Sequence, residues 1–216
     1  MRQPFIASAA AALLTLAGTV SAETLATAAV DLNVRSGPGP QYPIVGVIGA
    51  DSSATILGCI EDSQWCEVAF PGGEGWAYSA YLTAEYSGSP VVVTERWVDI
   101  GVPAVTYEGG GEAAVTGAVG GAVTGVLVGG PVGAAVGGAA GLAAGTVIDP
   151  PEQVRTYVSG DLGDPVYLDG EVVVGAQVPE TVVLRPIPDY EYQYVYVNGV
   201  PVLVEPAQRR IIYVMR

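Results

Sequence analysis

Two cysteines, Cys59 and Cys66, have the most clearly defined chemistry in this sequence. They flank a short loop at the ends of two adjacent predicted strands, where antiparallel pairing brings the thiols within bonding distance. We therefore expect a disulfide, which in the chain-entropy estimate stabilises a loop this short by roughly 2–3 kcal/mol. The alternative is a thiol pair used for redox exchange, but the C-x-x-C spacing typical of that chemistry is missing.

Residues suited to catalysis are scarce. The sequence contains no histidine, and all 8 basic residues are arginine, so the commonest general base, the commonest zinc ligand and the lysine nucleophile are absent. No G-x-S-x-G motif is present to activate a serine. We predict a protein that is not an enzyme, with no catalytic residue, no cofactor and no metal site. An envelope hydrolase is the least favoured alternative.

Aromatic residues of the N-terminal part favour a binding function. Exposed rings side by side on a small β-domain form a groove that can dock an extended peptide. The candidate groove residues are Tyr42, Trp65, Trp76, Tyr78 and Tyr81. In the alternative interpretation the two tryptophans fill the interior of the domain and only tyrosines reach the surface.

Short runs rich in β-branched and apolar residues position these aromatic side chains. Between residues 28 and 82 the runs are about five residues long, and clusters of Gly, Pro, Asp and Ser separate them. This spacing predicts a small all-β barrel or sandwich.

The same region resembles a known family. Its motifs are LNVRSGPG at 32–39, YPIVG at 42–46, W-x-x-V at 65–68, GWAY at 75–78 and YL at 81–82. In order and spacing they are similar to the bacterial SH3-like domain of envelope proteins. The resemblance implies a small barrel over residues 23–86 that binds a cell-wall peptide or a protein partner.

Residues 1–22 read as a secretory signal. Arg2 supplies the positive charge, residues 5–16 form an apolar run, and 20–22 form a small-residue cleavage site. The run is shorter than the ~20 residues of a membrane span. We expect an exported protein of the periplasm or cell envelope, where a disulfide is stable. The net charge of −14 makes nucleic acid a poor partner.

Glycine recurs at every fourth position in a stretch that carries no charge from residue 113 to 148. On a helix these glycines form one ridge that allows a second helix to approach closely. The ridge consists of Gly117, Gly121, Gly125, Gly129, Gly133, Gly137, Gly141 and Gly145. Pro131 divides the stretch, which predicts a hairpin of two helices over 112–148.

This pattern resembles the glycine-zipper motif of bacterial envelope and surface-antigen proteins. In water each helical glycine costs about 0.8–1 kcal/mol relative to alanine, whereas in lipid such ridges are a packing device. We therefore expect the hairpin to associate with a membrane. A hairpin that self-associates outside lipid, in a homo-oligomer, and a flexible linker are the alternatives.

Residues 149–216 are predicted to form a small antiparallel β-domain. An Asn198-Gly199 dipeptide inside the run 192–204 predicts a hairpin with a type I′ turn. Further strands are expected at 172–174, 182–184 and 210–214, with Pro201 on an unpaired edge. The motifs at 178–190 and 206–213 resemble an uncharacterised domain of alphaproteobacterial envelope proteins, which implies a location but no activity.

The sequence thus predicts a mainly β fold with a helical hairpin. The expected order is a signal peptide (1–22), an SH3-like barrel (23–86), a linker (87–111), a glycine-zipper hairpin (112–148) and a C-terminal β-domain (149–216). The predicted function is an exported envelope binding protein whose SH3-like domain recognises peptidoglycan or an envelope protein. The alternative is a membrane-inserted, self-associating protein with no wall ligand.

Overall fold

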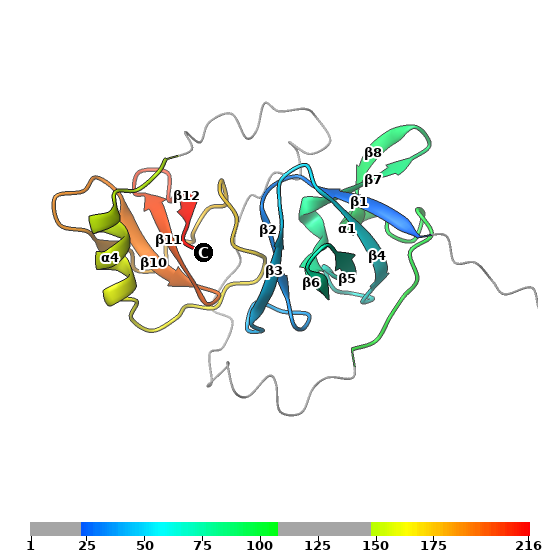
Figure 1. Ribbon diagram of the computed structural model, residues 1–216, viewed down its shortest axis with the longest axis horizontal. Helices are drawn as coiled ribbons and strands as arrows, with labels where there is room; N and C mark the ends of the chain where they lie inside the picture. Colours follow the sequence, from blue (N-terminus) through cyan, green and yellow to red (C-terminus); the bar gives the residue numbers. More distant parts are fainter. Residues whose placement is uncertain (1–22, 108–147) are drawn as a thin grey trace, which may run out of the picture.

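The computed structural model describes residues 23–107 and 148–216, which form two antiparallel β-sheets (Figure 1). The mainly β prediction is confirmed for these ranges. The signal segment lies outside the described residues, and so does the predicted glycine-zipper hairpin apart from its last residue. No helix within 23–107 or 148–216 has the length and apolar character needed to cross a bilayer.

The N-terminal sheet has 8 strands in the order β3-β2-β6-β5-β4-β1-β7-β8. Its elements are β1 (Thr24–Ala28), β2 (Leu32–Arg35), β3 (Ile44–Ile48), β4 (Ser53–Cys59), β5 (Trp65–Phe70), β6 (Gly73–Tyr78), the 3₁₀ turn η1 (Ser79–Tyr81), β7 (Leu82–Tyr86), β8 (Ser89–Val92) and the short helix α1 (Val93–Arg96). The predicted turn signals fall between these strands. Gly73, after the tight turn between β5 and β6, has a φ of +129°, which favours glycine.

Residues 89–107 pack against this sheet, although the sequence predicts a linker over 87–111. β8 pairs with β7, and Val92 and Val93 are buried. Further along, the backbone N–H groups of Cys59 and Val105 donate to the carbonyls of Pro103 and Cys59. Val92, Val93 and Val102 enter a core that local composition does not reveal, so the N-terminal domain extends to at least residue 107.

The C-terminal sheet has 4 strands in the order β12-β11-β10-β9. Its elements are the helix α4 (Glu152–Gly160) and the strands β9 (Arg185–Pro186), β10 (Gln193–Val197), β11 (Val200–Glu205) and β12 (Arg210–Val214). The predicted Asn-Gly hairpin joins β10 to β11, and β12 is the predicted strand at 210–214. Helix α4 was not predicted, although Val154 and Val158 lie four residues apart on its buried face.

Two details of this domain differ from the sequence prediction. The segments 172–174 and 182–184 are irregular and not strands; Val172, Val173 and Val182 are buried in the core, whereas Val183 is 80% exposed. Pro201 lies in β11, an inner strand, and not on an edge. Its missing N–H costs no ladder bond, because pairing with β12 begins at Val202 and the Pro201 carbonyl accepts from Met215.

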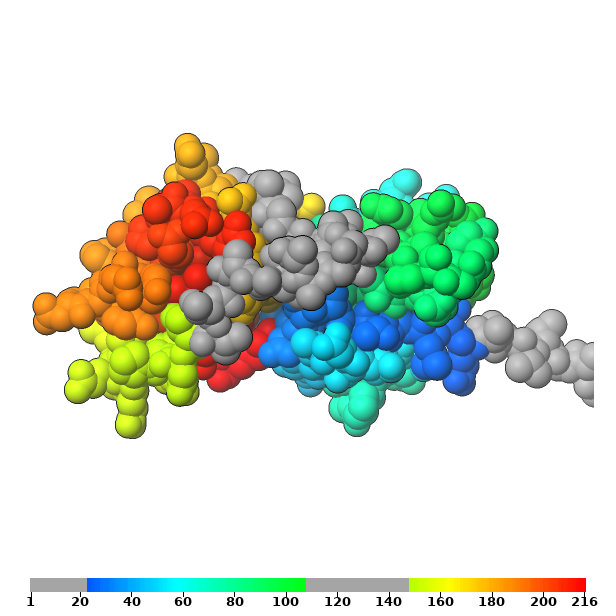
Figure 2. Space-filling model, turned by 90° about the horizontal axis from the view of Figure 1, so that it is seen from above, coloured from blue at the N-terminus to red at the C-terminus, as the bar shows by residue number. Residues whose placement is uncertain are grey.

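One apolar core continues through both sheets. Leu32 and Leu82 of the N-terminal domain belong to the same buried cluster as Leu168 and Val172 of the C-terminal domain. The two domains lie side by side, with β2 and β3 toward the C-terminal half (Figures 1 and 2).

Candidate functional site

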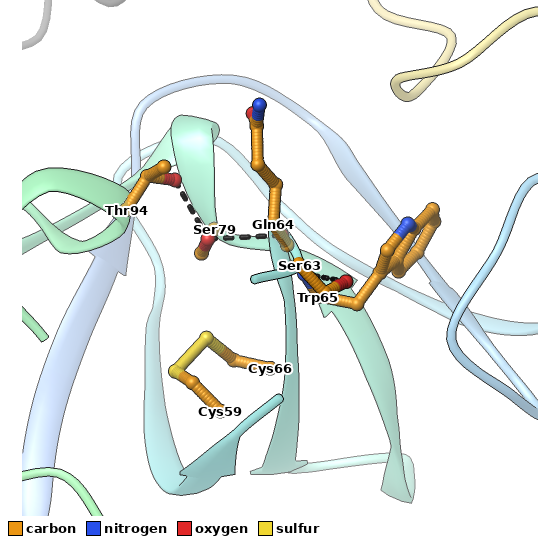
Figure 3. Close-up of a disulfide and its surroundings, with 7 residues drawn as sticks. All are labelled: Cys59, Ser63, Gln64, Trp65, Cys66, Ser79 and Thr94. Carbon is orange, nitrogen blue, oxygen red and sulfur yellow. Dashed lines mark hydrogen bonds between the residues drawn. A yellow bond between two sulfur atoms is a disulfide. The ribbon is translucent and has the colours of Figure 1, made fainter. Parts of the chain in front are cut away.

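The predicted disulfide is present between Cys59 and Cys66. These residues face each other across β4 and β5, with Cα atoms 4.0 Å apart (Figure 3). Both cysteines are buried. Nearby, the Ser79 hydroxyl donates to the backbone carbonyl of Gln64 at 2.9 Å and lies 2.7 Å from the Thr94 hydroxyl. Because the Cys59–Cys66 disulfide is buried, it is shielded from thiols that could exchange with it, and its role is structural.

The five aromatic residues predicted as a groove are buried, with exposed fractions of 3–7%: Tyr42, Trp65, Trp76, Tyr78 and Tyr81. They form two groups. The ring centroids of Trp65 and Tyr78 are 5.5 Å apart, and those of Tyr78 and Tyr81 are 5.9 Å apart. Tyr42 and Trp76 each meet the ring of Tyr107 edge to face, at 5.6 and 5.4 Å. The binding groove stays a prediction. It requires that the five rings become exposed to solvent.

Acidic residues of the C-terminal domain lie near one of these groups. Burial raises the pKa of Tyr78 to about 12, and the charge of Asp169 adds to the rise. Burial also raises the pKa of Tyr81, with smaller contributions from Tyr78 and the Glu171 carboxylate. Both tyrosines therefore stay neutral at physiological pH, beside the contact between the two domains.

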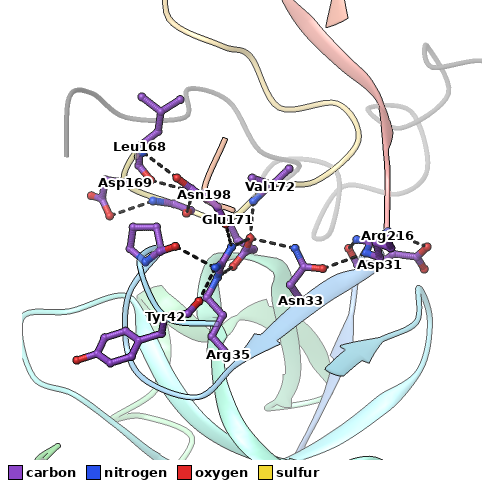
Figure 4. Close-up of polar contacts among 12 residues, drawn as sticks. Asp31, Asn33, Arg35, Tyr42, Leu168, Asp169, Glu171, Val172, Asn198 and Arg216 are labelled. Atoms are coloured by element: carbon purple, nitrogen blue, oxygen red, sulfur yellow. Dashed lines mark hydrogen bonds and ion pairs between the residues drawn. The ribbon is translucent and has the colours of Figure 1, made fainter. Parts of the chain in front are cut away.

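A buried ion pair between Arg35 and Glu171 lies at this contact (Figure 4). Their side chains are 1% and 0% exposed. The Arg35 Nε and Nη2 atoms donate to the two carboxylate oxygens at 2.5 and 2.7 Å. The other donors reach the carbonyls of Pro40 and Tyr42, at 2.9 and 2.7 Å, and that of Asn198 at 3.1 Å. All five donors of the guanidinium are used, as a buried charge requires.

Neighbouring polar side chains complete the network. The Asn33 Nδ2 donates to the Glu171 carboxylate at 3.1 Å, and the backbone N–H of Val172 donates to the same oxygen at 2.8 Å. The Arg216 Nε donates to the Asn33 Oδ1 at 2.9 Å, and its Nη2 donates to the Asp31 carbonyl at 2.9 Å. The C-terminal residue of the chain therefore contacts the N-terminal domain directly.

The β10–β11 turn holds the loop that carries Glu171. The Asn198 side chain donates to the carbonyls of Leu168 and Gly170 and accepts from the N–H of Leu168, at 2.8–3.1 Å. Both turn residues have positive φ, 51° at Asn198 and 77° at Gly199, as a type I′ turn requires. The turn therefore shapes the hairpin and also positions the segment 168–171.

Two cavities share Tyr167 and Tyr196. One, of about 370 Å³, lies between the domains, and Arg35 and Tyr42 line its other side. The second, of about 710 Å³, belongs to the C-terminal domain and reaches Arg185. Within the two described ranges, no group of cysteine, aspartate or glutamate side chains is placed to hold a metal ion.

Sequence reasoning missed the Arg35–Glu171 pair. One signal was available on the N-terminal side, since the polar Asn33 and Arg35 alternate with the apolar Leu32 and Val34 in one short strand. Glu171 precedes three valines and lies 136 residues from Arg35 in the sequence. The residues around Glu171 give no indication that it pairs with Arg35. A pairing over this separation follows from how the domains dock.

Comparison with known families separates the chain into the same two parts. Residues 30–83 form a bacterial SH3 domain. Residues 157–216 match DUF1236, a domain of unknown function. The SH3 resemblance is confirmed, and the C-terminal domain is one whose family carries no assigned activity. Because Arg35 lies in the SH3 domain and Glu171 in the DUF1236 domain, the ion pair joins the two.

Among curated proteins, the chain is similar to "Putative N-acetylmuramoyl-L-alanine amidase YrvJ" of Bacillus subtilis (strain 168). It is 31% identical over 81 residues, which cover 38% of this chain. The match spans only 15% of that protein's length. The similarity therefore concerns one module of this chain. It does not assign the amidase activity of the larger protein to this chain.

Proposed function

We propose that this protein is an exported cell-envelope binding protein whose SH3 domain recognises peptidoglycan or another envelope protein. The observation that carries the proposal is the SH3 domain at 30–83, a type of module that commonly binds peptidoglycan. The similar Bacillus subtilis protein is named "Putative N-acetylmuramoyl-L-alanine amidase YrvJ". The buried disulfide fits the oxidising conditions of an exported protein.

Binding suits the available side chains better than catalysis. The chain has no histidine to act as a general base near neutral pH. Among the described residues, the buried carboxylate of Glu171 is fully engaged by Arg35, Asn33 and a backbone N–H. A carboxylate held in this way accepts hydrogen bonds and is poorly placed to exchange protons with a substrate.

We further propose that residues 112–148 anchor the protein to a membrane or oligomerise it. The support is the strict glycine period and the absence of charge in that stretch. The alternative function is a membrane-inserted, self-associating protein that has no wall ligand. The two functions differ in whether the mature chain needs peptidoglycan or only lipid as its partner.

Sedimentation with purified peptidoglycan tests the main proposal. The mature chain, starting near residue 23, should pellet with peptidoglycan and stay in the supernatant with an insoluble polysaccharide such as cellulose. Cell fractionation tests the alternative. If the chain ignores peptidoglycan but stays in the membrane pellet until detergent is added, and a deletion of 112–148 makes it soluble, the alternative function replaces the first.

A further inference from the structure

We propose that Arg35 and Asn33 form a carboxylate-binding site on the SH3 domain, and that Glu171 occupies this site as an internal ligand. The external ligand is the acidic stem peptide of peptidoglycan, whose carboxylate takes the place of Glu171 when the C-terminal domain is displaced. This inference rests on the proposed function and adds the chemical group that the SH3 domain recognises.

The SH3 domain itself orients the guanidinium. The Arg35 Nη1 donates to the carbonyls of Pro40 and Tyr42, at 2.9 and 2.7 Å, and both carbonyls belong to the loop between β2 and β3. These two bonds do not involve the C-terminal domain. The opposite edge of the guanidinium, Nε and Nη2, therefore faces the partner as a preformed fork. Such a fork matches the two oxygens of a carboxylate.

Glu171 fills the fork in the way that a ligand carboxylate would. Its two oxygens accept from Arg35 Nε and Nη2, at 2.5 and 2.7 Å, and one of them also accepts from Asn33 Nδ2 at 3.1 Å. Three of its hydrogen bonds thus come from the SH3 domain. A carboxylate from another molecule can satisfy the same three donors, so the exchange leaves no buried charge unpaired.

The surroundings suit a peptide. Tyr78 and Tyr81 of the predicted aromatic groove lie near the segment that carries Glu171, close enough for Asp169 and Glu171 to affect their pKa values. Tyr42, whose carbonyl holds Arg35, belongs to the same predicted groove. Arg35 and Tyr42 also line one cavity together with Tyr167 and Tyr196 of the C-terminal domain, so the carboxylate site adjoins part of the predicted groove.

The covalent connection permits the exchange. Residues 108–147 connect the two domains covalently. Displacement of the C-terminal domain exposes apolar residues of the core that the two domains share, so the open form is a minor state that an external ligand selects. Because a tethered ligand competes at a high effective concentration, an external peptide gains access only when it is itself concentrated, as in an intact wall.

Full-length mature variants test the inference by sedimentation with purified peptidoglycan. Glu171→Gln keeps the size of the internal ligand but removes its charge. Arg216→Ala weakens the same contact by removing the bonds to Asn33 and Asp31, and it leaves Glu171 and Arg35 in place. Both variants should bind several-fold more peptidoglycan than the wild type. Adding Arg35→Gln to Arg216→Ala should return binding to background.

Tryptophan fluorescence and thermal unfolding establish that each variant is folded. If Arg35→Gln does not fold, Asn33→Ser serves in its place, because it removes one donor and keeps the guanidinium. If neither Glu171→Gln nor Arg216→Ala changes the amount of peptidoglycan bound, the role of Glu171 as an internal ligand is overturned, while the proposed function stays intact. Binding that survives the loss of Arg35 would overturn the carboxylate site. No wall binding by any variant means that the proposed function fails as well.

A peptide assay separates the wall from a protein ligand. A fluorescent octapeptide with the sequence of residues 167–174, YLDGEVVV, and its Glu→Gln counterpart are titrated into Arg216→Ala, with fluorescence polarisation as the readout. If the acidic peptide binds, the Gln form does not and peptidoglycan does not, the site takes an acidic protein segment and the wall assignment is overturned. Equal binding of both peptides would overturn the role of the carboxylate.

Discussion

Removing one partner of the Arg35–Glu171 pair should destabilise the whole protein. Glu171→Met leaves the Arg35 charge in a site where both side chains are at most 1% exposed, without the three bonds that the carboxylate accepted from Arg35 and Asn33. Breaking a buried pair in this way typically costs 3–5 kcal/mol. Arg35→Met should cost at least as much, because it also leaves the Pro40, Tyr42 and Asn198 carbonyls without their donor.

The double variant should cost much less than the sum of the single variants. With both side chains replaced by methionine, no unpaired charge is left in the core, and the remaining penalty comes from the orphaned carbonyls. We therefore expect a coupling free energy of about 3 kcal/mol. Because the apolar core continues through both domains, the loss should appear in the unfolding of the SH3 domain as well as of the C-terminal domain.

Urea unfolding of the mature chain measures this cycle. All 3 tryptophans belong to the N-terminal domain, so their fluorescence follows that half, and far-UV circular dichroism follows both. The two signals should change together in the wild type, and the m-value should be that of a single unit. Single variants that cost less than about 1 kcal/mol and add up in the double variant would refute the reasoning, because a solvent-exposed pair behaves that way.

The remaining predictions concern the disulfide, pH and one turn. Replacing both cysteines by serine should cost about 2.5 kcal/mol and lower Tm by about 5–10 °C in calorimetry, while an unchanged Tm would contradict a stabilising bond. The pKa values of Tyr78 and Tyr81 are raised in the folded state, so stability is full below pH 10 and falls by up to about 1.4 kcal/mol per pH unit for each tyrosine from pH 10 toward 12. Tm measured between pH 9 and 11.5, with phenolate absorbance, checks this, and a flat profile would contradict it. Gly199→Ala should cost about 1–2 kcal/mol, because its φ is +77°. Gly160→Ala, at the open end of α4, is the control that should leave Tm unchanged or higher.

Local sequence determined most of the strands and the covalent cross-link. β-Branched runs between turn residues are enough to place β4 and β5, and their antiparallel pairing brings Cys59 opposite Cys66. The Asn198-Gly199 turn is equally local, because its two positive φ angles suit these residue types. The motifs of the SH3 domain are also contiguous in sequence, which is why the resemblance is visible without a structure.

Only the tertiary structure decided which of these residues are buried and what they contact. The sequence predicted a linker at 87–111 and left open whether Trp65 and Trp76 line a groove or fill the interior, and the structure packs residues 89–107 on the sheet and buries both tryptophans. Burial depends on segments that arrive from elsewhere in the chain, and local patterns do not encode their arrival. The same reason hid the partner of Arg35, because Glu171 reaches it across 136 residues, and only the docking of two domains brings them together.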